Sequence, residues 1–188
     1  RVFNVLLLST GILGFLISLF SKELLVILSS NPDFIEAYKY VPFAIISFYV
    51  IFLGQLFNIK TFYYGNYHKF LFLATAAGIL GEVICCYLLI PAYGISGAIF
   101  SRTIAFSLQT ILLVYFSKKE RENPQMYNYR FLFFCLLIMS SLISIPYFVT
   151  FSFSLMVNLL IKLLIMVLVV AGVYRLFKKE IDPSLKLL

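Results

Sequence analysis

Three charged residues lie inside long apolar stretches of the sequence, and they are the residues best suited to chemistry. They are Glu82, Arg102 and Lys162. A charged side chain at the centre of a membrane-spanning helix costs roughly 2.5–3.5 kcal/mol, so such a residue usually has a function or a partner. A cation suits an anionic substrate, and a carboxylate suits a proton or a metal cation. These residues therefore indicate binding or ion pairing.

The composition places these charges in a membrane protein. Of the 188 residues, 62% are hydrophobic and 12% are charged, and the mean hydropathy is +1.01. Soluble domains are about 45–50% apolar and about 25% charged, so a soluble enzyme, a disordered tail and a nucleic-acid-binding domain are excluded. We expect an all-α, polytopic membrane helix bundle, because six stretches have the length of about 20 apolar residues that a spanning helix needs. These stretches are 2–20, 41–58, 70–90, 95–116, 131–149 and 154–177.

The basic residues predict the orientation of these six helices. If the amino end of the first helix is cytoplasmic, the inner segments hold eleven basic residues and the outer segments hold only Lys22 and Lys39. This asymmetry follows the positive-inside rule, and it explains the net charge of +7 without a nucleic-acid partner. Both ends of the chain are therefore expected on the cytoplasmic side, in contact with anionic membrane lipids. Because the chain begins at Arg1, we expect it to be a piece of a longer polypeptide.

Glu82 and Arg102 are predicted to lie at the same depth. The third and fourth stretches are separated by Pro91-Ala92-Tyr93-Gly94, a tight turn between antiparallel helices. Both charges then lie ~12–14 Å from that turn, at about 1.5 Å per residue. Three arrangements stay open: a structural ion pair, separate placement, or a water-filled cavity in which Arg102 meets an anionic substrate. In the last case Glu82 tunes Arg102 or carries a coupling proton or cation.

Two further features have a plain and a functional interpretation. Lys162 is expected to extend toward the outer headgroups, or to contact a lipid phosphate in a groove. Gly78 and Gly81 beside Glu82 indicate close helix packing, or a hinge of the kind that transporters have.

No catalytic constellation or metal-ligand spacing is visible in the sequence. His68 is the only histidine, and no acidic or cysteine cluster accompanies it. The three cysteines, Cys85, Cys86 and Cys135, all lie in apolar runs and favour neither a disulfide framework nor a metal site. We therefore expect neither an enzyme nor a cofactor.

The polar segments between the stretches carry their own signals. The outer segment 21–40 is the longest, and its Asn31 or Asp33 is suited to cap a helix. Pro42 predicts a bend where the next helix enters the membrane. Residues 118–124, which include Lys118 and Pro124, form the clearest linker and divide four helices from a final pair.

Two runs of residues resemble a known family. The first is Phe20-Ser21-Lys22-Glu23-Leu24-Leu25-Val26-Ile27-Leu28, followed by Asn31-Pro32-Asp33-Phe34-Ile35-Glu36-Ala37-Tyr38. The second is Leu88-Leu89-Ile90-Pro91-Ala92-Tyr93-Gly94-Ile95-Ser96-Gly97-Ala98. Over residues 1–118 the chain resembles polysaccharide flippases of the O-antigen and capsule type, in the multidrug/oligosaccharidyl-lipid/polysaccharide exporter superfamily. Glu82 departs from this pattern, in which a neutral polar residue is more usual.

The resemblance implies a transporter of 12 to 14 helices in two lobes, located in the bacterial inner membrane. Such a transporter moves a polyprenyl-diphosphate-linked oligosaccharide between leaflets by alternating access, driven by a gradient of H⁺ or Na⁺. Residues 1–118 would complete the second lobe, and residues 119–188 would add a linker, a helix pair and a cytoplasmic tail. Family members hold the diphosphate with cavity cations, and Arg102 is the matching candidate here by position and charge.

Three alternatives stay open. A drug/cation antiporter of the same superfamily would use Glu82 as its proton or sodium site. A membrane polymerase or ligase of glycan assembly would have a large outer loop rich in arginines or acids, and segment 21–40 has no arginine. A purely structural membrane subunit would not need Glu82 and Arg102 to respond to substrate.

Overall fold

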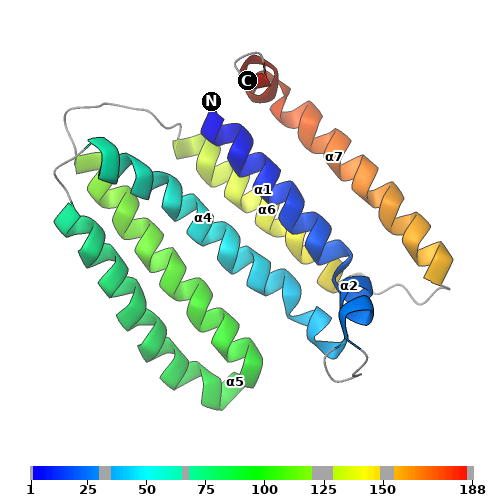
Figure 1. The fold of residues 1–188 in the computed structure, drawn as a ribbon, viewed down its shortest axis with the longest axis horizontal. Helices are drawn as coiled ribbons and strands as arrows, with labels where there is room; N and C mark the ends of the chain where they lie inside the picture. The colour runs from blue at the N-terminus through cyan, green and yellow to red at the C-terminus, as the bar shows by residue number, and fades with distance from the viewer. Residues whose placement is uncertain (1, 30–34, 65–67, 120–128, 149–154, 186–188) are drawn as a thin grey trace. The chain divides into compact units, whose positions relative to one another are not determined.

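The structure is a computed structural model that describes residues 2–29, 35–64, 68–119, 129–148 and 155–185 (Figure 1). The described chain is all-helical, as the composition predicts. Its elements are α1 (Val2–Leu19), α2 (Ser21–Leu28), the 3-10 helix η1 (Glu36–Lys39), α4 (Val41–Tyr64), α5 (His68–Lys119), α6 (Tyr129–Phe148) and α7 (Leu155–Leu185). The predicted helix cap at Asn31 or Asp33 and most of the predicted linker lie outside the described residues.

Four helices of the described chain are long and apolar enough to cross a membrane, or five if α1 and α2 together form one bent span. One of the four is α5, whose apolar segment runs from Lys69 to Phe116. The chain reverses direction at Gly94, so α5 is a helical hairpin with two arms (Figure 1). Each arm has about 25 residues, and about 20 are enough to span a bilayer. With the arms counted separately, long helices lie over the stretches expected from hydropathy, and α1 qualifies as a span only together with α2.

Contacts between the two arms of α5 fix their antiparallel register. The Phe70 and Phe116 rings stack with centroids 4.7 Å apart near the open end of the hairpin. Gln109 Nε2 donates a hydrogen bond of 3.4 Å to Thr75 Oγ1 one turn further along. Gly78 is covered by the Gln109 side chain, which lies so close that a methyl group on Gly78 would crowd it. The glycine therefore serves close packing, and the helix around it is regular.

Gly94 permits the reversal because its backbone has φ 57° and ψ −130°. This region is almost exclusive to glycine, and another residue held there costs of order 1–3 kcal/mol.

We expect Gly94→Ala to lower the free energy of unfolding by about 1–3 kcal/mol, measured as thermal unfolding in detergent. The matched control is Gly172→Ala in α7, which also has open space beside its Cα and lies in a regular helix. That substitution should be neutral or slightly stabilising, and equal losses for both variants would contradict the assignment.

The chain divides into two compact units, residues 1–42 with 137–188 and residues 43–136. The units are defined by contacts within this chain. The division expected after residue 118 concerns the lobes of a longer transporter, so the two divisions have different bounds. In the unit 43–136, α4 packs on the second arm of α5 through small polar side chains. The hydroxyls of Ser47 and Thr103 lie 2.5 Å apart, and Thr110 Oγ1 donates to the Val50 carbonyl over 3.2 Å.

In the unit of residues 1–42 and 137–188, α1 packs against α7 and against the second half of α6. Met139 of α6 covers Gly11 of α1, and Ser18 Oγ donates a 2.7 Å hydrogen bond to the Ile143 carbonyl. Gly11 therefore lies where α1 and α6 approach closely. After Leu19 the chain turns by 63° into α2, so the outer segment begins with a bent helix.

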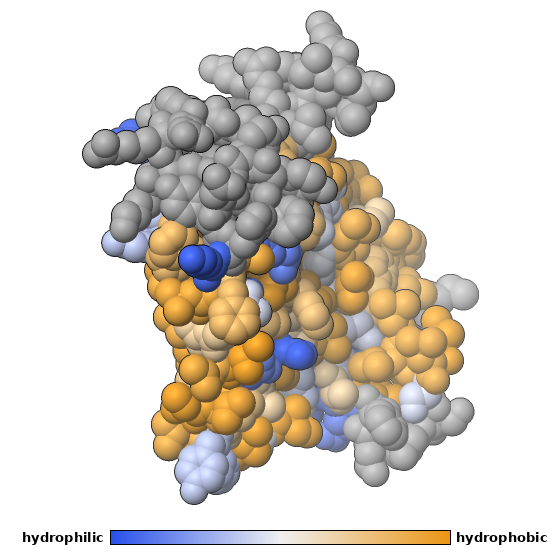
Figure 2. Space-filling view, turned by 60° about the vertical axis from the view of Figure 1, so that its left-hand side comes forward, coloured by the Kyte–Doolittle hydropathy of each residue, from blue (hydrophilic) through white to orange (hydrophobic). Residues whose placement is uncertain are grey.

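The surface of the described chain is predominantly apolar. In the view of Figure 2, hydrophobic side chains cover most of the described face. Large exposed side chains follow one another along both the first arm of α5 and α7, where residues such as Leu80, Tyr87, Leu164 and Leu168 are more than half exposed. Soluble monomers rarely expose such wide apolar patches. The surface is compatible with a membrane protein.

Candidate functional site

Two ion pairs of the described chain lie within apolar helical surroundings, and they differ in how open they are. One joins Glu82 to Arg102 across the arms of α5, and the other joins Glu23 of α2 to Lys162 of α7. Each pair belongs to a different compact unit. All three charges that the sequence singles out within apolar stretches are therefore paired with an opposite charge.

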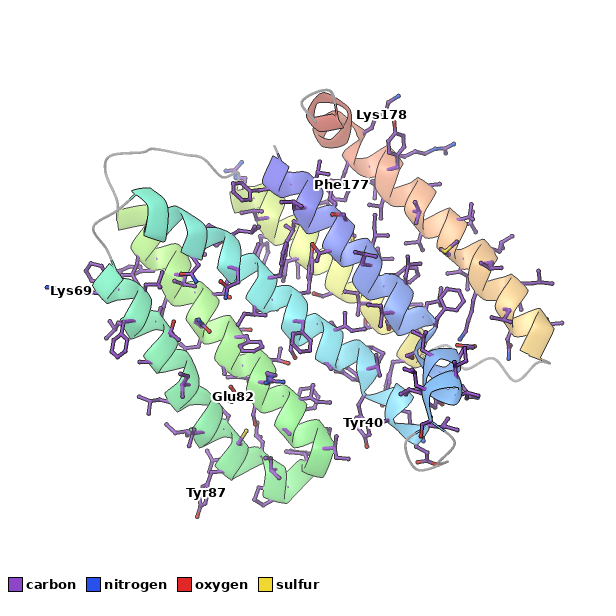
Figure 3. The ribbon with its side chains drawn as sticks, viewed as in Figure 1. Tyr40, Lys69, Glu82, Tyr87, Phe177 and Lys178 are labelled. Atoms are coloured by element: carbon purple, nitrogen blue, oxygen red, sulfur yellow. The ribbon has the colours of Figure 1, made fainter. Side chains whose placement is uncertain are left out.

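The pair in α5 confirms that Glu82 and Arg102 lie at the same level of the hairpin. Glu82 Oε1 is 3.5 Å from Arg102 Nε. Figure 3 shows Glu82 between the two arms, whereas Tyr87 on the same arm points away from them. The Arg102 side chain is 50% exposed and the Glu82 side chain 35% exposed. The contact is therefore longer than a close ion pair, and both of its side chains are partly exposed.

Aromatic rings hold the Arg102 guanidinium in place. Its Cζ lies 5.8 Å from the Phe48 ring centroid of α4 and 5.6 Å from the Phe106 ring centroid of its own arm. Both distances are within the range of cation–π attraction. The carboxylate contact is made through Nε, and the two terminal nitrogens belong to a side chain that is half exposed. A planar guanidinium fixed in this way can offer those nitrogens to a second anion.

The pair of Glu23 and Lys162 has the opposite character. Lys162 Nζ lies 2.6 Å from Glu23 Oε1 and 2.7 Å from Oε2, and the two side chains are only 11% and 22% exposed. Lys162 Nζ is also 5.8 Å from the Phe20 ring centroid. Lys162 thus points to α2 and neutralises the carboxylate of Glu23. Its geometry favours a structural role over direct substrate contact.

The structure shows close packing at Gly78 and Gly81. The first arm of α5 is regular around Glu82, and Gly94 is the residue of α5 with non-helical backbone angles. Gly81 packs on the Leu108 side chain of the second arm. The small glycine residues let the two arms of α5 come close together. This close approach allows the Glu82 carboxylate to reach Arg102.

The histidine and the cysteines do not form a common site within the described part of the chain. The His68 side chain lies outside the description, and Cys85 and Cys86 are half-buried thiols on the first arm of α5. Cys135 is buried, with its Sγ 3.6 Å from the Tyr49 hydroxyl. No group of three His, Cys, Asp or Glu residues within the described ranges is placed to hold a metal ion.

A pocket that the sequence did not predict lies in the unit of residues 1–42 and 137–188. It is lined by residues of α1, α2, η1, α6 and α7, and it includes Lys22, Lys39 and Lys162. The distribution of basic residues predicts that Lys22 and Lys39 lie on the outer side of the membrane. The helix that carries Lys162 is predicted to begin on that same side. The missing information was the bend before α2, which brings Glu23 and Lys22 toward α7.

Comparison with known proteins gave no relative. No protein-family model, no curated protein and no solved structure matches this chain.

Proposed function

We propose that this chain is part of a membrane transporter that moves an anionic, lipid-linked substrate by alternating access. The substrate class we favour is a polyprenyl-diphosphate-linked oligosaccharide, carried from the inner to the outer leaflet of a bacterial inner membrane for surface polysaccharide synthesis. The proposal combines the resemblance of residues 1–118 to polysaccharide flippases with the geometry of Arg102.

The observation that carries the proposal is the open ion pair in an apolar hairpin. Facing lipid directly, a half-exposed guanidinium would be costly, because hydrocarbon offers it no hydrogen-bond acceptor. Its exposed side is therefore best matched by a water-filled cavity or by a polar partner. The two terminal nitrogens of an arginine can bind a phosphate in a bidentate manner, so a diphosphate suits this position.

In this proposal Glu82 serves as the partner of Arg102 between transport events. The carboxylate keeps the guanidinium neutralised when no substrate is bound, and the long N–O distance of 3.5 Å makes the contact easy to exchange. The exchange also offers a route for coupling, since a carboxylate released from its arginine can take up H⁺ or Na⁺. An antiporter would use the same carboxylate as its main site, with a cationic substrate in place of the diphosphate.

The test uses a strain that lacks the gene of the intact protein, and it measures polyprenyl-linked oligosaccharide on each leaflet of the inner membrane. We expect the oligosaccharide to accumulate on the cytoplasmic leaflet, and we expect the intact gene to reverse this. Normal translocation with unpolymerised or untransferred units outside would overturn the proposal in favour of an assembly enzyme. An unchanged glycan profile would overturn it in favour of the antiporter or a structural subunit.

A further inference from the structure

The pocket in the unit of residues 1–42 and 137–188 is separate from the Arg102 pair and has a different charge balance. Its volume is about 480 Å³, within the range of about 300–1,000 Å³ that small-molecule sites occupy. It lies where the bend into α2, the 3-10 helix η1, the end of α6 and the beginning of α7 come together. The lining residues are Ser18, Leu19, Ser21, Lys22, Glu23, Tyr38, Lys39, Pro42, Ile145, Pro146, Tyr147, Asn158, Lys162 and Ile165.

Three lysines and one carboxylate line this pocket. The carboxylate of Glu23 is fully engaged by Lys162, with both oxygens within 2.7 Å of Nζ. The charges of Lys22 and Lys39 are thus left over among the lining residues. Lys39 shares its charge with Glu36 outside the lining, in an exposed pair. An anion would be attracted by both lysines, whereas an apolar or cationic ligand would gain nothing from them.

The contacts of Lys22 and Lys39 leave their ammonium groups available. Lys22 Nζ lies 5.7 Å from the Tyr38 ring centroid, a contact that positions the lysine and leaves its charge uncancelled. Lys39 is 3.7 Å from Glu36, a pair whose side chains are 49% and 76% exposed. Exposed pairs of this kind contribute about 0–1 kcal/mol, so Lys39 can exchange Glu36 for a stronger acceptor.

The position of the pocket near the beginning of α7 favours a ligand from the headgroup region. Its α7 residues lie about one to three turns along a helix of 31 residues, at 3.6 residues per turn. At about 1.5 Å per residue this helix is long enough to cross the hydrocarbon core and both headgroup regions. A pocket near its end is therefore within reach of the headgroups, and Ser18, Tyr38 and Asn158 add polar groups to its wall.

We propose that this pocket binds a phosphate group through Lys22 and Lys39, with the Glu23–Lys162 pair as its fixed wall. The phosphate is carried either by the headgroup of an anionic lipid or by a free phosphate compound. This site is independent of the transport proposal, because its occupancy can be measured without transport.

The experiment measures binding of short-chain phosphatidylglycerol to the intact, detergent-purified protein by native mass spectrometry. The double variant Lys22→Gln/Lys39→Gln should weaken the tightest binding event by roughly 25-fold, at about 5-fold per lysine. The matched control, Lys69→Gln/Lys178→Gln, also removes two lysines, and both point away from the helices in Figure 3. The control should change the affinity of that event by less than about 2-fold.

Two further arms distinguish the source of the phosphate and guard against misfolding. Competition by soluble glycerol phosphate would identify a free phosphate compound, and its failure to compete would identify a lipid headgroup. The single variant Lys39→Gln alters a half-exposed residue and should still lose about 5-fold. Equal affinity in the wild type, the single variant and the double variant would overturn the proposal.

Discussion

Arg102→Ala in the intact protein is expected to abolish transport of the lipid-linked substrate while the protein remains inserted and expressed. The variant removes a half-exposed cation, and it leaves Glu82 without its paired charge in an apolar hairpin. An anionic substrate would then meet net negative charge. Transport should fall by at least about 100-fold, since loss of a charged hydrogen bond and the added repulsion together exceed about 3 kcal/mol.

Two matched variants separate charge from expression effects. Arg102→Lys keeps the charge and loses the planar fork, so it should retain partial transport. Arg175→Ala removes an exposed arginine from α7 and should transport like the wild type. Normal transport by Arg102→Ala would show that the assignment of Arg102 is wrong.

The double variant Glu82→Gln/Arg102→Gln tests whether the pair is only structural. If Arg102 contacts substrate, the double variant should transport no better than Arg102→Gln alone. If the pair only compensates buried charge, removing both charges should be better tolerated than removing one. Transport assays on the three variants distinguish these outcomes.

Glu23→Gln is expected to cause the largest loss of stability of any single change discussed, about 3 kcal/mol. It leaves the Lys162 ammonium largely buried without its carboxylate, and loss of one partner of a buried pair typically costs 3–5 kcal/mol. The side chains are 11% and 22% exposed, which places the expected value at the lower end of that range. Thermal or denaturant unfolding of the detergent-purified protein measures the loss.

The control for this prediction is Glu36→Gln, which removes a carboxylate from an exposed lysine pair and should change stability by less than about 0.5 kcal/mol. The double variant Glu23→Gln/Lys162→Met should be more stable than Glu23→Gln alone, because no unpaired charge remains. Equal stability of Glu23→Gln and the wild type would contradict the structural role of the pair.

Local signals in the sequence were sufficient to predict the helices and the register of α5. Long apolar runs form helices in a membrane because a helix pairs its own backbone hydrogen-bonding groups. The reversal at Gly94 divides α5 into two arms of similar length. Counting residues from that turn then placed Glu82 opposite Arg102, and the 3.5 Å contact confirms this prediction. The role of Arg102 in transport is a separate question, which stays a prediction.

The Glu23–Lys162 pair and the lysine pocket could not be predicted because they depend on a bend. The backbone turns by 63° between α1 and α2, with Phe20 as the junction residue. Neither glycine nor proline marks that point, since Phe20 and Ser21 follow a long apolar run. The ion pair that joins α2 to α7 links residues 139 positions apart, and local sequence patterns carry no information about such long-range contacts.

The most direct test of the transport proposal follows the substrate in a purified system. The intact protein is reconstituted into vesicles that hold a fluorescent polyprenyl-diphosphate disaccharide in one leaflet, and a membrane-impermeant quencher reports the leaflet of the label. We predict that the wild type moves the label to the opposite leaflet, and that Arg102→Ala moves it no faster than protein-free vesicles. Wild-type vesicles that match the protein-free rate, or equal rates for the wild type and Arg102→Ala, would contradict the account.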